Sequence, residues 1–158
     1  MDGGHDLARC EEVTTETLRT VFDALAAYDV RLEGMLLKPN MVISGKLCPT
    51  QATAEEVATA TLRCFRRTVP AAVPGIVFLS GGQGDEQATD NLNAMHTRGD
   101  HLPWQVSFSY GRALQAPSLA AWGGKDENVA AAQAAYLHRA RMNSLARTGS
   151  YSAELERA

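Results

Sequence analysis

The chain has 158 residues, of which 45% are hydrophobic and 21% charged, a composition typical of a globular domain with a real core rather than of a disordered chain. Its formal net charge is −3, and its basic residues are scattered instead of gathered into a stripe. We therefore expect no binding of nucleic acid or of an anionic membrane surface.

The cysteines and the N-terminal residues indicate a cytoplasmic protein. Cys10, Cys48 and Cys64 are odd in number, lie far apart and form no Cys-x-x-Cys pair, which argues against a disulfide framework and against a zinc site. Residues 1–6 are polar and acidic, and no run of about 18 apolar residues occurs. We expect a reducing cytoplasm, no export signal and no membrane-spanning segment.

The first half of the chain predicts a helix, a strand and a second helix. Residues 14–28 carry apolar side chains at helical spacing, namely Leu18, Val21, Phe22 and Leu25. The run Gly34–Lys38 is apolar until its last residue and ends at a proline, which is typical of a strand buried on both faces. Thr53 and Glu56 have the spacing of a capping box, so a helix is expected to begin there and to end near Arg67.

The second half repeats this alternation. Strands are expected at Ile76–Ser80 and at Gln105–Ser109, and helices over residues 85–96 and 128–148. Strands that alternate with helices imply right-handed crossovers and a parallel sheet. Three strands are visible, whereas a closed (β/α)₈ barrel needs eight strands and about 250 residues. The sequence predicts an α/β fold that forms part of such a barrel, with no second domain.

Three polar segments follow the three predicted strands. They are Lys38, Ser80-Gly81-Gly82, and Ser109-Tyr110-Gly111-Arg112. In parallel α/β folds the functional groups lie at the C-terminal ends of the strands. These segments are therefore the candidate site.

Lys38 is one of three lysines, and the four residues before it are apolar or glycine. A lysine in dry surroundings is driven towards its neutral amine, because desolvation disfavours the ammonium, and a neutral amine attacks carbonyl carbon. A lysine at a strand end can equally reach water or pair with a carboxylate. Spacing alone leaves both readings open.

The other two segments carry groups that bind phosphate. Ser80-Gly81-Gly82 offers a hydroxyl and successive backbone N–H groups just before a helix. Against this, Asp85 and Glu86 fall in the first turn of that helix, and Gly-Gly after a strand is often only a tight turn. Arg112 follows Gly111, and a guanidinium can bind two phosphate oxygens, but a surface arginine fits the same pattern.

The remaining ionisable residues offer less. Glu33 precedes Lys38 by about 16 Å of extended chain, which puts it at the wrong end of the predicted strand for a general base. The four histidines show no metal-ligand spacing, so no metal is expected.

Three runs taken together, Leu36–Val42, Phe78–Gln83 and Ser107–Gln115, resemble the last three strands of class I fructose-bisphosphate aldolases. The resemblance extends to Asp2-Gly3 with His5-Asp6-Leu7, although Gly4 departs from it, and to Ala121–Lys125 with Glu127-Asn128. It therefore covers nearly the whole chain in one order.

The resemblance implies a function and a set of roles. Lys38 matches the lysine that forms an imine with the substrate ketone, which needs no metal or other cofactor because the protonated imine accepts the electron pair. The activity implied is reversible cleavage of fructose 1,6-bisphosphate, a small phosphorylated sugar, to dihydroxyacetone phosphate and glyceraldehyde 3-phosphate in glycolysis and gluconeogenesis, by a homo-oligomeric full-length enzyme. The residues that match the pocket for the phosphate on the dihydroxyacetone side are Ser80, Gly81, Gly82, Ser109, Gly111 and Arg112.

The chain also departs from the family pattern. Strands one to five, which carry the acidic proton-transfer residues, have no counterpart here, and no tyrosine-ended tail follows Tyr151. Three readings stay open: an incomplete gene model, a truncated and catalytically impaired half-barrel that binds phosphorylated ligands, or the partner of a separate N-terminal half. A different Schiff-base aldolase on a barrel is the remaining alternative. We expect the 158-residue chain by itself to be inactive.

Overall fold

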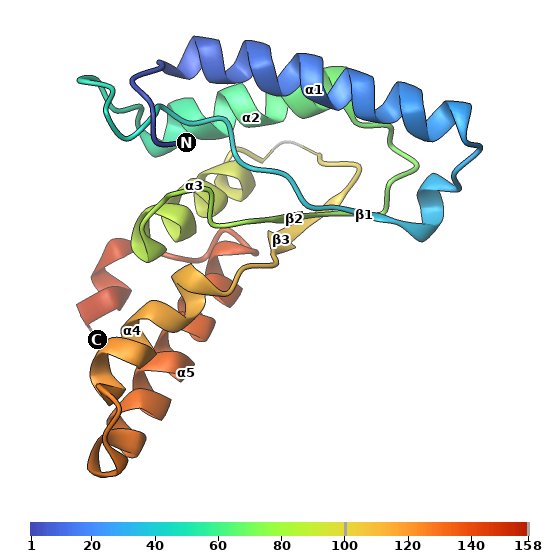
Figure 1. The fold of residues 1–158 in the computed structure, drawn as a ribbon. Helices are drawn as coiled ribbons and strands as arrows, with labels where there is room; N and C mark the ends of the chain where they lie inside the picture. The colour runs from blue at the N-terminus through green and yellow to red at the C-terminus, as the bar shows by residue number, and fades with distance from the viewer. Residues whose placement is uncertain (100, 158) are drawn as a thin grey trace.

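A computed structural model describes residues 1–99 and 101–157 of the chain. In these ranges one parallel sheet is accompanied by helices (Figure 1). The elements are α1 Leu7–Ala27, β1 Leu36–Leu37, α2 Ala54–Thr68, β2 Gly75–Phe78, α3 Asp85–Thr97, β3 Gln105–Phe108, α4 Arg112–Trp122 and α5 Val129–Ala146, with short 3₁₀ helices at Leu32–Gly34, Asp126–Asn128 and Ala153–Arg157.

The three strands pair in chain order and all run parallel, as the sequence predicted. Leu37 is paired with Ile76 and Phe78 with Phe108, so β2 is the central strand of the described sheet. Helices α2 and α3 make the crossovers between successive strands. The predicted α/β architecture with three parallel strands and flanking helices is confirmed.

The expectation that the first strand is buried on both faces is wrong. β1 covers only Leu36–Leu37, and its two side chains have opposite surroundings: Leu37 is 9% exposed, whereas Leu36 is 61% exposed. Successive side chains of a strand point to opposite faces, so one face of the sheet meets the helices and the other is left open at this edge. The apolar run reflects a strand made for a two-sided environment, of which the described residues supply one side.

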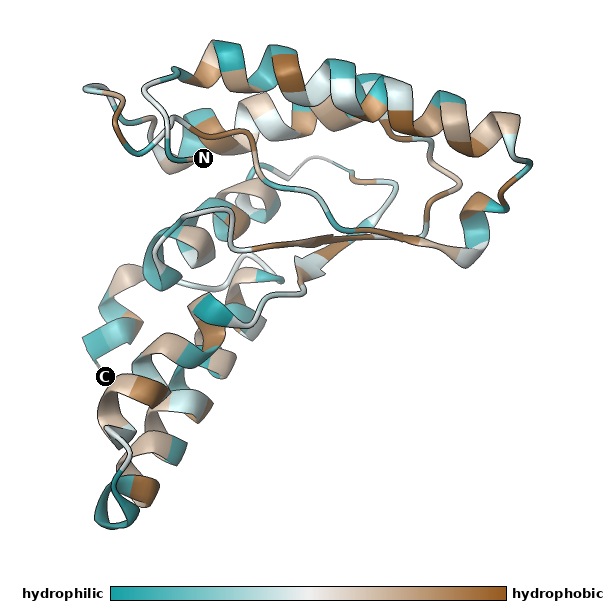
Figure 2. Ribbon diagram, viewed as in Figure 1, coloured by the Kyte–Doolittle hydropathy of each residue, from teal (hydrophilic) through white to brown (hydrophobic). Residues whose placement is uncertain are grey.

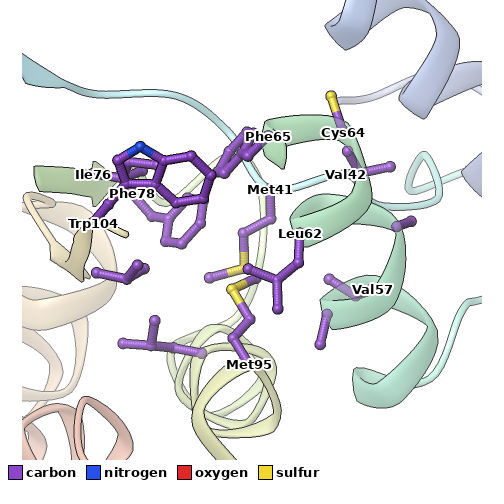
Figure 3. Packing of buried hydrophobic residues seen from close by; sticks show 14 of the residues in the cluster. Met41, Val42, Val57, Leu62, Cys64, Phe65, Ile76, Phe78, Met95 and Trp104 are labelled. Atoms are coloured by element: carbon purple, nitrogen blue, oxygen red, sulfur yellow. The ribbon is translucent and has the colours of Figure 1, made fainter. Parts of the chain in front are cut away.

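The covered face of the sheet builds the core. Phe65 of α2 stacks on Phe78 of β2 with ring centroids 5.8 Å apart and meets Trp104 edge to face at 6.5 Å (Figure 3). Met41 and Met95 complete the centre of the cluster and are fully buried. Truncating a buried phenylalanine costs about 3–5 kcal/mol, so this contact between the first crossover helix and the central strand is a main source of stability.

Helix α1 begins earlier than predicted because Asp6 caps it. The Asp6 carboxylate accepts a hydrogen bond from the Arg9 backbone N–H at 2.8 Å. The buried side chains of the helix are spaced four residues apart and are Cys10, Thr14, Leu18 and Phe22. The first two are small, and the apolar pattern in the sequence did not include them. The opposite, hydrophilic side of α1 faces away from α2 (Figure 2).

The capping box of α2 is confirmed. The Thr53 hydroxyl accepts from the Glu56 N–H at 3.3 Å, and the Glu56 carboxylate accepts from the Thr53 N–H at 2.8 Å. The helix ends at Thr68, one residue past the predicted end.

Helix α4 was not predicted. Pro117 lies inside it, and a proline in a helix interior removes a backbone hydrogen bond and normally argues against a helix. Here α4 packs along α5 as a hairpin that projects away from the sheet, and the Ser118 hydroxyl donates to the Ala132 carbonyl at 2.8 Å (Figure 1). The described residues after β3 therefore form two α-helices where the sequence predicted one.

Candidate active site

The C-terminal ends of the three strands lie at one edge of the sheet, and the pairing continues past the strands. The Leu79 N–H donates to the Pro39 carbonyl at 3.1 Å, and the Ser109 N–H donates to the Phe78 carbonyl at 2.9 Å. Lys38, Ser80 and Ser109 therefore leave the sheet side by side at the same edge, as parallel pairing predicted.

The loop from β2 to α3 turns through two left-handed glycines. Gly81 has φ +57° and Gly82 has φ +83°, and the Gln83 N–H closes the turn on the Ser80 carbonyl at 3.0 Å. A Cβ on Gly82 would also approach the Lys46 side chain to 3.2 Å. Both the conformation and the crowding favour glycine at this position.

This loop is joined to the loop from β3 to α4. The Arg112 guanidinium donates to the Gln83 carbonyl at 2.6 Å, and the Ala113 N–H donates to the Ser80 hydroxyl at 3.4 Å. Gln83 is 1% exposed and accepts through its side chain from Asn91 at 2.7 Å. Ser80 and Arg112, which are 32 positions apart in the sequence, are thereby brought together, and the supporting role of Gln83 and Asn91 was missed because no periodicity marks it.

The two helices that begin at these loops differ in charge. The first turn of α3 contains Asp85 and Glu86, whereas α4 begins with Arg112 and has no acidic residue in its first turn. The partial positive charge of a helix N-terminus is offset by acidic residues in α3 and reinforced by the guanidinium in α4. An anion is therefore favoured at the start of α4, next to Ser80.

For Lys38, the structure shows the second of the two environments that the sequence left open. The residue is exposed, so it reaches water, and the described residues do not give it dry surroundings. It lines a cavity of about 540 Å³ between α1 and the open edge of β1, together with Leu37, Leu79 and Leu18. Because β1 is the edge strand and its outer face is uncovered, nothing in the described ranges withdraws the amine from solvent.

Glu33 lies in the 3₁₀ helix Leu32–Gly34, which precedes β1 and so stands at the opposite end of the strand from Lys38, as predicted. Within residues 1–99 and 101–157, no group of three or more His, Cys, Asp or Glu side chains is arranged to hold a metal ion. In the same ranges, no helix combines the length and the apolar character needed to cross a membrane.

Tyr110, between Ser109 and Gly111, is a residue whose role the sequence did not indicate. Its ring stacks on Phe108 with centroids 4.3 Å apart, and its hydroxyl donates to the Asn143 side chain of α5 at 2.7 Å. Burial raises the pKa of Tyr110 to about 12. The tyrosine thus fixes the loop that carries Arg112 to a distant helix.

Comparison with known proteins agrees with the resemblance in sequence. The family model described as "Glycolytic: Fructose-bisphosphate aldolase class-I" matches residues 1–158. Fructose-bisphosphate aldolase B of Sparus aurata is 55% identical over 150 residues, which are 95% of this chain and 41% of that protein. The aldolase of Dictyostelium discoideum is 52% identical over 154 residues, which are 98% of this chain and 43% of that protein.

A solved structure is similar as well. The fructose-bisphosphate aldolase from Plasmodium falciparum, in a ternary complex with TRAP and a small molecule inhibitor, superposes with a TM-score of 0.91 at 52% identity. The superposition covers 96% of this chain and 43% of that chain. The chain therefore spans about two fifths of the length of the relatives it matches.

Proposed function

The chain belongs to the class I fructose-bisphosphate aldolase family, and we propose that it supplies the imine-forming lysine and one phosphate pocket of an enzyme that cleaves fructose 1,6-bisphosphate reversibly. Its three parallel strands and their helices are the C-terminal part of the (β/α)₈ barrel of that family. The observation that carries the proposal is the joining of Ser80 to the start of α4 at the same sheet edge as Lys38.

Lys38 is the proposed nucleophile. Its amine adds to the keto carbon of the substrate, water is lost, and the resulting protonated imine draws in the electron pair of the breaking carbon–carbon bond. The position of Lys38 supports this role because Lys38 follows β1 directly and lines a cavity with both apolar and polar walls, which include Leu37 and Asn40. It also leaves the sheet next to the loop that begins with Ser80.

The phosphate on the dihydroxyacetone side is proposed to lie at the start of α4. Arg112 offers its guanidinium as the charged partner, and the turn at Gly81-Gly82 offers backbone groups on the other side. The full proposed set is Ser80, Gly81, Gly82, Ser109, Gly111 and Arg112.

Cleavage also needs proton transfer at the substrate hydroxyl, and we assign this to groups outside the 158 residues. Glu33, the carboxylate nearest to Lys38 along the chain, stands at the wrong end of β1. We further propose a reducing, cytoplasmic setting, supported by the three free cysteines, Cys10, Cys48 and Cys64, and assembly of the complete enzyme as a homo-oligomer.

The experiment is trapping of the imine. Residues 1–158 would replace the matching segment of the Plasmodium falciparum aldolase, and the hybrid would be reduced with borohydride in the presence of dihydroxyacetone phosphate. Peptide mapping is expected to find the adduct on Lys38, and Lys38→Arg should abolish it. An adduct on Lys46 or Lys125 would overturn the assignment.

A second candidate function is specific to the 158-residue chain: binding of phosphorylated ligands without turnover. The phosphate loops are joined by their own hydrogen bonds, whereas Lys38 is exposed at an open edge. Calorimetry should detect binding of dihydroxyacetone phosphate to the chain. Absence of binding at millimolar ligand would reject this second function.

A further inference from the structure

The C-terminal 3₁₀ helix, Ala153–Arg157, is fixed to α5 by a buried ion pair. Glu156 accepts from both terminal nitrogens of Arg139, at 2.7 and 3.1 Å, and contacts Nε2 of His138 at 3.1 Å. The Arg139 side chain is only 3% exposed and that of Glu156 10%. Such a two-point pair fixes the orientation of both planar groups.

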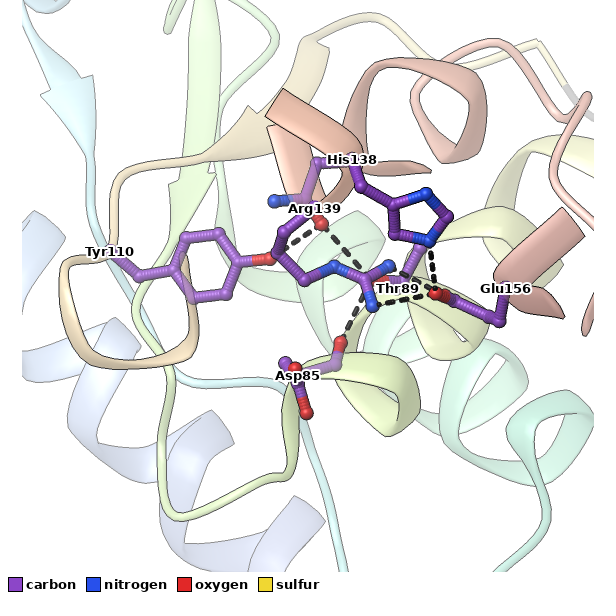
Figure 4. A network of polar contacts seen from close by, with 7 residues as sticks. Asp85, Thr89, Tyr110, His138, Arg139 and Glu156 are labelled. Carbon is purple, nitrogen blue, oxygen red and sulfur yellow. Dashed lines mark hydrogen bonds and ion pairs between the residues drawn. The ribbon is translucent and has the colours of Figure 1, made fainter. Parts of the chain in front are cut away.

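Arg139 also contacts α3. Its Nη2 donates to the Thr89 hydroxyl at 3.0 Å (Figure 4). The single proton of that hydroxyl is shared between two acceptors, the Asp85 carbonyl at 2.8 Å and the Asn143 side-chain oxygen at 2.9 Å. The same Asn143 oxygen accepts from the Tyr110 hydroxyl at 2.7 Å. Contacts therefore run without a gap from Glu156 near the C-terminus to the loop that carries Gly111 and Arg112.

The orientation of Arg139 depends on Glu156. Glu156 is the one carboxylate that the guanidinium meets among the described residues, and the Arg139 Nε is buried there without a hydrogen-bond partner. A buried guanidinium that loses its carboxylate is strongly destabilised and must turn towards another acceptor or towards water. Either movement withdraws the donor from Thr89.

The hydrogen-bond partners of Glu156 stabilise its ionised form. Burial by itself raises the pKa of Glu156, but the hydrogen bonds from Arg139, Tyr151 and His138 outweigh it, so that the pKa lies below its ordinary value. The carboxylate is thus held ionised, which is the form that Arg139 requires.

We propose that Arg139 is a positioning residue through which docking of the C-terminal segment, Ser152–Arg157, fixes Tyr110 and the loop Ser109–Arg112 in the geometry that receives phosphate. Glu156 fixes the orientation of the Arg139 side chain, and Arg139 in turn fixes the side chains of Thr89 and Asn143. Asn143 then accepts the hydrogen bond from the hydroxyl of Tyr110. The ligand named here rests on the proposed function, whereas the coupling itself concerns only residues of this chain.

The test uses the 158-residue chain with a matched pair of variants. Glu156→Gln removes the charge that holds Arg139. Glu154→Gln is the control, because it makes the same change in the same segment at an exposed residue whose carboxylate accepts a hydrogen bond from Ser152. The backbone amide resonances of Ser109–Arg112 and the dissociation constant for dihydroxyacetone phosphate are measured for each. Tyr110→Phe, alone and combined with Glu156→Gln, closes a double-mutant cycle.

We expect Glu156→Gln to shift the amide resonances of Tyr110 and Gly111 and to weaken ligand binding about 3- to 10-fold, the usual range for residues that act through a contact network. Glu154→Gln should do neither. The double variant should bind about as weakly as the weaker single variant, because both changes interrupt the same path.

Unchanged Tyr110 and Gly111 resonances in Glu156→Gln, or losses that multiply in the double variant, would overturn the proposal. If the unsubstituted chain binds no dihydroxyacetone phosphate, the proposed function fails for this chain, and the amide shifts still decide whether the coupling exists. A loss of binding in Glu156→Gln with no change in those resonances would assign the effect elsewhere and also reject it.

Discussion

The two ends of the candidate site are built differently. At the phosphate end, Ser80 and Arg112 lie on two loops that are hydrogen-bonded to each other and to buried Gln83. At the imine end, Lys38 leaves a two-residue edge strand and is exposed beside Leu36, which is 61% exposed.

The difference shows that the two halves of the proposed chemistry have different requirements. Phosphate binding needs donors held in place, and the described residues hold them by contacts among β2, β3, α3 and α4. Imine chemistry needs a lysine shielded from water and partners for proton transfer, and both must come from protein that covers the open face and edge of β1. The comparison predicts that binding and turnover can be separated in this chain.

The largest expected effect is on turnover. The 158-residue chain alone should cleave fructose 1,6-bisphosphate at least about 10⁴-fold more slowly than the hybrid with the Plasmodium falciparum segment. Each proton-transfer group that we propose to lie outside the 158 residues contributes about 10²–10⁴-fold. A coupled assay of dihydroxyacetone phosphate release measures both rates. Cleavage by the chain alone at about 1 s⁻¹, an ordinary enzymatic turnover, would contradict the prediction that this chain separates ligand binding from turnover.

The next effect tests the phosphate end. In the hybrid, Arg112→Ala should lower kcat/KM by an amount that corresponds to about 2–4 kcal/mol, because a charge-assisted contact to phosphate is lost. Arg112→Lys should restore part of this, since a point charge cannot reproduce the two-point contact. Arg19→Ala, an exposed arginine on α1, is the control. Equal kinetic constants for Arg112→Ala and the control would remove Arg112 from the site.

The same division explains what the sequence could predict. The capping box at Thr53, the three parallel strands and the shared edge of Lys38, Ser80 and Ser109 follow from local patterns and from the geometry of parallel sheets. The assignment of roles at that edge came from the resemblance to a family, and it stays a proposal.

Features that depend on distant or missing partners could not be predicted. The sequence of β1 is suited to burial on both faces, and only the structure shows that one face is open. Helix α4 was not predicted because Pro117 lies inside it and disfavours a helix locally. The packing of α4 along α5 outweighs that local preference. The pair of Arg139 with Glu156 joins residues 17 positions apart with no periodic signal.

The smallest effect is on stability at alkaline pH, and it tests whether the phosphate end is closed in solution. Burial raises the pKa of Tyr110 from its ordinary 10.0 to about 12, and the pKa of Tyr151 is raised too, first by burial and then by Glu156. Between these pH values the unfolded chain releases the phenolic proton while the folded chain keeps it, so the folded state binds more protons. The contribution of Tyr110 to the free energy of unfolding must then fall as the pH rises above 10 and level off near 12, whereas the contribution of Tyr151 continues to fall.

For Tyr110 we expect a share of about 1–2 kcal/mol, below the roughly 2.7 kcal/mol that two full pKa units represent, because the side chain is only partly buried. Urea unfolding at pH 9, 10, 11 and 12 measures the decline. Tyr110→Phe should make it shallower, whereas Tyr28→Phe, at a tyrosine that is 84% exposed at the C-terminal end of α1, should leave it unchanged. If both variants decline as steeply as the unsubstituted chain, Tyr110 meets water freely, and the phosphate end is as open as the edge that carries Lys38.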